Sequence, residues 1–201
     1  MKNSAYLLVI LMSFFGFINV RSQTKAVVDL QKSSELVVHG STNLLTFKLK
    51  QPGGKIMDKP LTLTATQNGN RIYLSENKLS IEVENFKSDN FIAQSEFYKL
   101  MQTEKYPKLH IEIDYFEMNR DELGKIKGGS AMLNINITGV NRKYIFPVTT
   151  KKNGDLITAT GKKKLTIKDF GLIPPVAMLG MVRVSEWIVI DFDIQCKVKF
   201  V

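Results

Sequence analysis

Two pairs of carboxylates have a spacing that could support acid–base chemistry. Asp191 and Asp193 are two residues apart, and so are Glu82 and Glu84. On a β-strand such residues share one face, and two neighbouring carboxyl groups can act as general acid and general base. In both segments, however, apolar side chains occupy the alternate positions. We therefore predict that these carboxylates lie on solvated strand faces and are not catalytic.

The histidines and the cysteine add little further chemistry. His39 and His110 are the only histidines, and the sequence places no other ligands around them at a spacing that would hold a metal ion. Cys196, the only cysteine, falls on the apolar side of a strand-like segment, which predicts a buried and unreactive thiol. The sequence also lacks a nucleophile elbow, a phosphate-binding glycine loop and a catalytic Cys/His signature. We therefore expect no catalytic residues, no metal and no cofactor.

Alternating apolar and polar residues dominate the rest of the sequence. In WIVIDFDIQCKVKFV (187–201), the apolar side chains from Ile188 to Phe200 fall on one side and mostly polar ones on the other. A period of two is typical of a β-strand with one solvated face. The same pattern predicts inward-facing sets at Leu45, Phe47 and Leu49; Leu61, Leu63 and Ala65; Leu79, Ile81 and Val83; Leu109, Ile111, Ile113 and Tyr115; and Ala131, Leu133, Ile135 and Ile137. Shorter strands are expected near 34–40, 71–75, 143–149, 155–160 and 164–168.

Turn-forming stretches separate these segments, among them QPGGK, QNGNR and KKNGD. Many amphipathic strands joined by short turns predict an antiparallel all-β fold. Because each strand has a single solvated face, the sequence leaves two architectures open, a sandwich or a closed barrel.

One segment, 88–107, has a helical pattern instead. Its apolar residues recur at helical spacing and predict one helix of about three turns near 91–103. Ser88 or Asp89 could cap the start of this helix, and Pro107 would help to end it. The apolar residues of this pattern are Ala93, Phe97, Leu100 and Met101.

The first 22 residues are predicted to form a secretory signal peptide. Lys2 supplies a basic start, residues 7–20 are predominantly apolar, and Val20 and Ser22 supply the small residues of a cleavage site. The apolar run is shorter than the ~20 residues that a membrane-spanning helix needs. Residues 23–201 would then form one domain of an exported protein, which we expect in the periplasm or outside the cell.

The charge of the chain is positive but dispersed. Removing residues 1–22 lowers the formal charge from +9 to +7, and the densest basic cluster is 162–164. Nucleic acid is not an expected partner of an exported protein. We expect a solvated basic surface, which is also compatible with weak contact with anionic membrane surfaces. The sequence leaves open whether the protein forms a homodimer.

The chain carries more apolar residues than its strands need. The loop GLIPPVAMLGM (171–181) has no charge, although surface loops are normally polar. This loop and the predicted helix could plug the ends of a barrel or sandwich, or they could form the mouth of an apolar cavity. A barrel of about eight strands can hold one small ligand, and methionines suit a lining that adapts to a flexible chain.

Four stretches in the same order resemble the YceI-like family of exported, lipocalin-like proteins. They are LVVHGSTNLLTFKLK (36–50), SEFYKLMQTEKYPKLHIEI (95–113), GGSAMLNINITGVNRKYIFPV (128–148) and IKDFGLIPPVAMLGMVRVSEWIVIDFDI (167–194). The resemblance implies an antiparallel lipocalin-like barrel of about eight strands, with an apolar channel for an isoprenoid or another long-chain amphiphile. The hairpin GSTNLLTF departs from related sequences, because it lacks the histidine or tryptophan often found there.

On this resemblance, the loop and the helix would border the cavity and contact the ligand. Lys168, Asp169 and Arg183 flank the loop and could meet a polar head group. The residues predicted to bind the ligand are Phe91, Phe97, Leu100, Met101, Phe170, Leu172, Ile173, Val176, Met178, Leu179 and Met181.

Three functions follow from these observations. The leading hypothesis is a periplasmic carrier that holds an isoprenoid-type lipid inside the barrel. The second is a non-catalytic structural or interaction module whose barrel is filled by its own side chains. The third is an enzyme, for which the only motivation is the charged trio beside the loop.

Overall fold

The computed structural model describes residues 23–57, 59–120 and 126–201, and the predicted signal peptide lies outside the described residues. The strands are β1 (Gln23–Leu30), β2 (Glu35–Ser41), β3 (Thr46–Pro52), β4 (Leu61–Asn68), β5 (Arg71–Ser75), β6 (Leu79–Glu82), β7 (Lys108–Arg120), β8 (Ile126–Ile137), β9 (Val140–Asn153), β10 (Leu156–Thr166), β11 (Val176–Ala177), β12 (Val182–Arg183) and β13 (Trp187–Phe200). The helices are α2 (Gly53–Ile56), α3 (Phe91–Leu100) and the short 3₁₀ helices η1 (Val83–Asn85), η2 (Ile167–Phe170) and η3 (Met178–Gly180).

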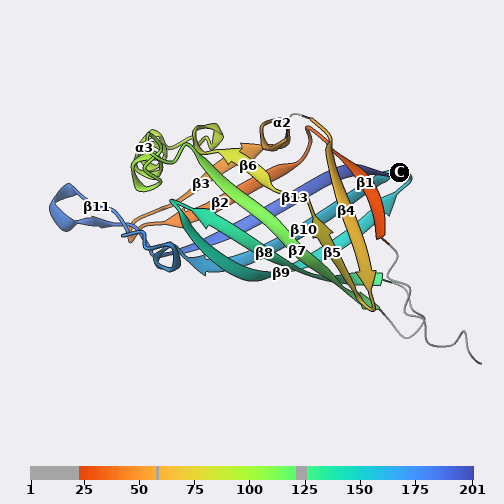
Figure 1. Ribbon diagram of the computed structural model, residues 1–201. Coiled ribbons are helices and arrows are strands. Elements are labelled where there is room, and N and C mark those ends of the chain that lie inside the picture. The colour runs from red at the N-terminus through yellow and green to blue at the C-terminus, as the bar shows by residue number, and fades with distance from the viewer. Residues whose placement is uncertain (1–22, 58, 121–125) are drawn as a thin grey trace, which may run out of the picture.

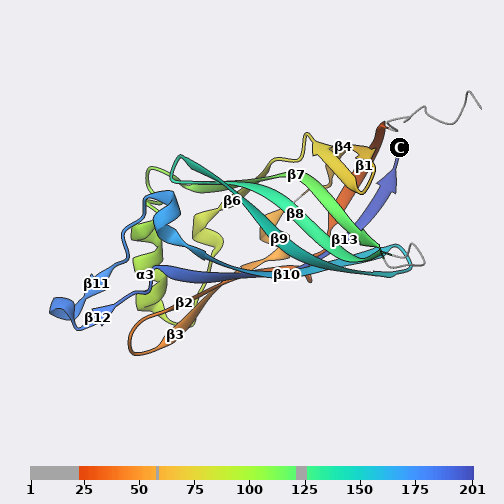
Figure 2. The ribbon, with the colours of Figure 1, turned by 90° about the horizontal axis from the view of Figure 1, so that it is seen from below.

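Eight antiparallel strands close into a ring (Figures 1 and 2). Their order is β1-β4-β5-β7-β8-β9-β10-β13, and pairing of β13 with β1 completes the circle. This confirms the predicted all-β barrel of about eight strands and excludes the sandwich. Closure leaves no free edge within the ring.

At one end of the barrel, strands β2, β3 and β6 extend the wall beyond the eight-strand ring. The long strand β13 pairs with β1 along its C-terminal half and with β2 along its N-terminal half. In the same way, β7 pairs with β6 through residues 108–111 and with β5 through residues 115–117. Strand β3 and the residues after η1 meet through a pair of backbone hydrogen bonds between Lys50 and Lys87, at 2.8 and 2.9 Å. The wall of the barrel therefore continues around its circumference near α3.

Most predicted strands are present, but some boundaries differ. The two short strands predicted at 155–160 and 164–168 are one continuous strand, β10, which ends at Thr166 where η2 begins. Strand β6 ends at Glu82, so Val83 and Glu84 belong to η1 and Glu82 and Glu84 do not share a strand face. Strands β1, β11 and β12 were not predicted from the sequence.

A β-bulge changes one predicted face. The pairing of β7 with β8 shifts register between Ile113 and Tyr115, so Asp114 is an extra residue on β7. An extra residue reverses the alternation of side chains beyond it. Tyr115 therefore packs against Tyr73, with ring centroids 5.7 Å apart, while Phe116 takes the inward position that the sequence pattern assigned to Tyr115.

The predicted helix is confirmed as α3, with a different cap. The side chain of Asn90 accepts a hydrogen bond from the backbone N–H of Ala93, so Asn90 is the N-cap in place of Ser88 or Asp89. Helix α2 falls in the QPGGK stretch that was predicted as a turn. Among the described residues, none of the helices is long and apolar enough to cross a bilayer.

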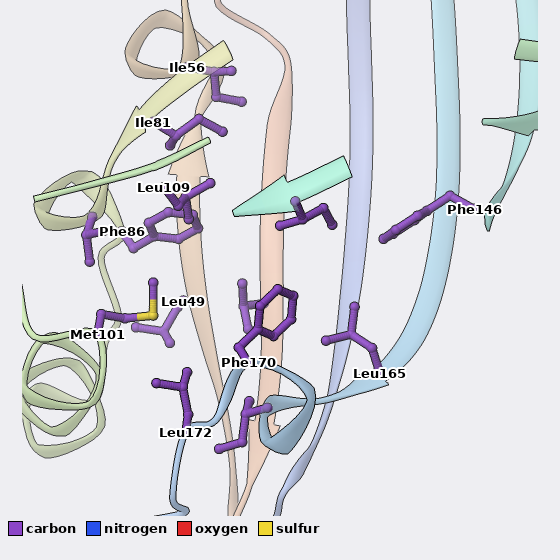
Figure 3. Close-up of a cluster of buried hydrophobic side chains, with 14 residues drawn as sticks. Leu49, Ile56, Ile81, Phe86, Met101, Leu109, Phe146, Leu165, Phe170 and Leu172 are labelled. Carbon is purple, nitrogen blue, oxygen red and sulfur yellow. The ribbon is translucent and has the colours of Figure 1, made fainter. Parts of the chain in front are cut away.

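The buried apolar cluster lies at the end of the barrel that carries α3 (Figure 3). Met101, at the end of α3, reaches toward Leu49 of β3 and Phe86 after η1, while Phe170 and Leu172 approach from the segment that follows β10. The cluster anchors the helix and the 167–172 segment on the strands.

Candidate ligand-binding site

A cavity of about 1480 Å³ occupies the barrel interior. Drug-sized ligand pockets typically measure about 300–1,000 Å³, so this cavity is large for a protein of this size. Every strand of the eight-strand ring contributes side chains to it, and nearly all of them are apolar. The barrel is therefore hollow, and the hypothesis of an interior filled by side chains is not supported.

Strand β13 shows how the sequence pattern produces this lining. Its inward side chains from Ile188 to Val198 line the cavity and are only partly buried, although those up to Ile194 also pack against the buried apolar cluster. The side chain of Phe200 lies outside what the structure describes. The predicted inward sets of β4 and β8 line it as well. These residues are Ile188, Ile190, Phe192, Ile194, Cys196 and Val198 in β13, Leu61, Leu63 and Ala65 in β4, and Ala131, Leu133, Ile135 and Ile137 in β8.

Five of the residues predicted to bind the ligand lie in the cavity wall. Phe97, Leu100 and Met101 reach it from α3, and Phe170 and Leu172 reach it from the end of η2 and the loop that follows. Phe97 is held by Phe86, with ring centroids 5.5 Å apart. The helix and the loop are thus brought together at one end of the cavity, as the sequence analysis expected. Contact of these residues with a ligand stays a prediction.

Five other predicted residues have side chains that project away from the cavity. Phe91, at the start of α3, is 81% exposed. The remaining four belong to the loop and its hairpin, in which the same backbone presents one side to the cavity and the other to solvent. They are Ile173, Val176, Leu179 and Met181. The side chain of Met178 lies outside what the structure describes.

The three charged residues beside the loop are engaged in local structure. Lys168 forms an ion pair with Glu186. Arg183 donates a hydrogen bond from Nε to the carbonyl oxygen of Gly180, at 3.2 Å. Asp169 accepts a hydrogen bond from the Tyr144 hydroxyl at 2.6 Å. None of these three described residues lines the cavity. Their role in binding a head group stays a prediction.

Tyr144 fastens η2 to the barrel wall. Burial raises the pKa of the Tyr144 hydroxyl above its ordinary value, and the hydrogen bond to Asp169 raises it further. The hydroxyl is therefore protonated at physiological pH and remains a donor to Asp169. The Tyr144 ring also packs on Phe170, with centroids 6.1 Å apart. Together these contacts hold the segment that ends in Leu172 against β9.

One polar side chain deep in the cavity wall has a structural role that the sequence did not reveal. Asn77 donates a hydrogen bond to the carbonyl oxygen of Ile113 at 3.0 Å and accepts one from its N–H at 2.6 Å. These backbone groups lie at the β-bulge, where they would otherwise lack partners. Asn77 therefore supplies hydrogen-bond partners to the backbone N–H and carbonyl oxygen at the bulge, and both ends of its amide are used in these bonds.

Asp191 and the two histidines, which were first considered for catalysis or metal binding, lie on the outer face of the barrel, whereas Cys196 faces inward. Asp191 pairs with Lys162 at 2.8 Å and lies 3.4 Å from Nε2 of His39. His110 contacts the hydroxyl of Ser80 through Nδ1 at 2.9 Å. Cys196 was predicted to be buried but is only partly so, because it lines the cavity; its partial burial raises the pKa of the thiol. Within the described part of the chain, no three His, Cys, Asp or Glu residues are grouped so as to hold a metal ion.

Comparison with solved structures shows a similar fold in two bacterial proteins. BcnA of Burkholderia cenocepacia has a TM-score of 0.53 and 13% sequence identity, with 85% of this chain and 99% of that chain covered. A cysteine variant of the Campylobacter jejuni YceI protein has a TM-score of 0.50 and 12% identity, over 66% of this chain and 78% of that one. No curated protein matches the sequence.

The sequence itself decides the family. The model of the YceI-like domain matches residues 38–196, from within β2 almost to the end of β13. This range covers most of the barrel wall, α3 and the apolar loop. The chain therefore belongs to the YceI-like family.

Proposed function

We propose that the protein binds a long-chain apolar molecule of isoprenoid type inside the barrel and carries it in the periplasm. The observation that supports this most is the apolar cavity of about 1480 Å³ inside a closed barrel. An apolar cavity of this size favours an apolar occupant, because water gains few hydrogen bonds there. The export implied by the predicted signal peptide is consistent with a periplasmic role.

The chemistry of the wall favours a chain over a compact polar ligand. Each methylene that moves from water into the cavity contributes about 0.8 kcal/mol. Ten methylenes would thus contribute about 8 kcal/mol before the cost of ordering the chain. Asn77, the buried polar side chain in the wall, is already paired with Ile113. Binding energy would therefore come from chain length rather than from specific polar contacts.

We expect the affinity for linear alcohols to rise steeply with chain length. From octanol to tetradecanol, each methylene removed from water should tighten binding about fourfold, the equivalent of about 0.8 kcal/mol. Displacement of a fluorescent fatty-acid probe from the full-length mature protein measures these affinities. Matched alkanediols should bind more weakly, because one hydroxyl would enter the apolar cavity. Affinity that is independent of chain length would contradict the proposal.

A further inference from the structure

Exposed apolar side chains gather at the end of the barrel that carries α3. They come from the β2–β3 turn, from the first turn of α3 and from the hairpin formed by β11, η3 and β12, which projects beyond the barrel (Figures 1 and 2). Monomeric proteins rarely expose so many large apolar residues in one place without a function. We name these residues the apolar rim: Leu44, Leu45, Phe91, Ile92, Ile173, Val176, Leu179 and Met181.

Hydrogen bonds join two parts of the rim into one unit. The Asn43 side chain donates to the carbonyl oxygen of Met181 at 2.9 Å and accepts from the N–H of Arg183 at 2.9 Å. The Asn43 N–H also donates to the carbonyl oxygen of Arg183 at 3.1 Å. Thr42 and Val184 form an isolated antiparallel bridge beside them. The hairpin is therefore fastened to the β2–β3 turn and presents its apolar side chains in a fixed arrangement.

The rim is continuous with the mouth of the cavity. Leu44 and Leu45 are exposed and also line the cavity. On the hairpin, the cavity-lining residues Pro175 and Val182 are neighbours in sequence of the exposed Val176 and Met181. An apolar molecule that leaves the cavity at this end would therefore pass directly onto an apolar surface.

The tip of the hairpin has an unusual backbone. Leu179 has φ +53° and ψ +33°, the left-handed region that asparagine or glycine adopts more readily than leucine. Its side chain is fully exposed. A strained backbone that displays a bulky apolar side chain to solvent is the kind of feature that functional surfaces retain.

Charges around the rim are mainly basic. Between residues 164 and 187 the basic residues are Lys164, Lys168 and Arg183, and the acidic ones are Asp169 and Glu186, of which Glu186 is paired with Lys168. The adjoining strand β3 contains Lys48 and Lys50 but no acidic residue. Nearby, the half-exposed Trp187 has the Lys164 ammonium 4.9 Å from its ring centroid. Tryptophan and basic residues around an apolar surface match the boundary between lipid chains and anionic head groups. This pattern favours an anionic bilayer over a protein surface.

A second copy of the chain is a poorer match for the rim. A stable protein–protein contact buries about 800 Å² on each partner. The projecting hairpin offers little surface, because it has only two strands of two residues each. A thin, convex tip can enter a lipid surface without needing a complementary groove.

We propose that the apolar rim inserts into the surface of an anionic phospholipid bilayer and places the cavity mouth at the membrane. This inference rests on the proposed function, because docking there would let a long-chain ligand move between bilayer and cavity. The insertion itself depends only on the rim residues and can be tested without a ligand.

Co-sedimentation of the mature protein with vesicles tests this proposal. The wild-type protein should bind vesicles of phosphatidylethanolamine and phosphatidylglycerol more tightly than vesicles of phosphatidylcholine at low salt. The double variant Ile173→Ser/Leu179→Asn should weaken this binding about tenfold or more, because two large apolar side chains no longer enter the bilayer. Asparagine tolerates the left-handed backbone at position 179, so thermal stability should not fall. The matched control, Val201→Asn, removes an exposed apolar residue from the far end of the molecule and should bind like wild type.

Three outcomes would overturn the proposal. They are absence of vesicle binding by the wild-type protein at low salt, equal binding by the double variant, and concentration-dependent dimerisation that the double variant abolishes without any vesicle binding. Displacement of the fatty-acid probe, measured without vesicles, tests the cavity separately. If vesicle binding depends on the rim but long-chain alcohols do not bind, the proposed function fails and membrane docking stands.

Discussion

The variant Ala159→Trp should lose affinity for tetradecanol by about tenfold or more, with little loss for octanol. Ala159 lines the cavity from β10, well below the end that carries α3 and η2. An indole there would shorten the cavity, so a long chain would lose several buried methylenes at about 0.8 kcal/mol each. A short chain held near the mouth would keep its contacts. Probe displacement with both alcohols measures the difference.

Stability of the same variant gives an independent test of the hollow interior. In an open cavity the indole fills empty space, so the free energy of unfolding should change by less than about 1 kcal/mol. In a filled core the added volume would cost about 1–3 kcal/mol. Thr158→Trp places the same side chain on the outer face of β10 and should leave tetradecanol binding unchanged. Equal tetradecanol affinity for Ala159→Trp and wild type would contradict a long continuous cavity.

The second large effect is on stability. Phe86→Ala should lower the free energy of unfolding by about 3–5 kcal/mol, which is typical of removing a buried phenyl ring. Phe86 is 1% exposed and contacts Phe97, and its carbonyl oxygen accepts a hydrogen bond from the Tyr98 hydroxyl at 2.8 Å. The ring is therefore central to the attachment of α3 to the barrel. Urea denaturation measures the change.

Phe91→Ala is the matched control for Phe86→Ala. Phe91 begins α3, the helix that Phe86 packs against, but it is mostly exposed, so its truncation should change the free energy of unfolding by less than about 0.5 kcal/mol. Similar losses for the two variants would show that α3 is not anchored through Phe86.

Hydrophobic alternation was sufficient to predict most of the barrel wall. The period-two pattern assigned the inward faces of β4, β8 and β13 correctly. A shift of one residue in strand register would turn every apolar side chain outward, so the pattern constrains the register strongly. It failed at Tyr115, where the bulge at Asp114 reverses the faces. Nothing in the local pattern indicates that extra residue, and the side chain of Asn77, which bonds to the backbone of Ile113 beside it, lies 36 residues away in sequence.

Strand β1 could have been predicted and was not. Ala26, Val28 and Leu30 alternate with polar or outward-facing residues and line the cavity. The segment directly follows the predicted signal peptide, and its pattern is short. Its partner β13 is distant in sequence, so the pairing that closes the ring is a tertiary feature.

The candidate site was predictable in location but not in detail. The uncharged composition of 171–181 and the helical spacing around Phe97 placed both segments at an apolar site, and both border the cavity mouth. Composition does not tell which side of a hairpin faces inward. Leu172 therefore lines the cavity while Ile173 and Leu179 point to solvent. The connection through Asn43 also depends on residues far apart in the chain.

Solvent extraction of protein purified from the periplasm of a native-like host, followed by mass spectrometry, tests the proposed carrier function most directly. We expect about one long-chain isoprenoid or similar amphiphile for each folded chain, since the cavity of about 1480 Å³ is apolar and continuous. Protein with Ala159→Trp, purified in parallel, should carry less of it or a shorter molecule. If folded wild-type protein with an open cavity were repeatedly recovered without any long-chain molecule, this result would contradict the account.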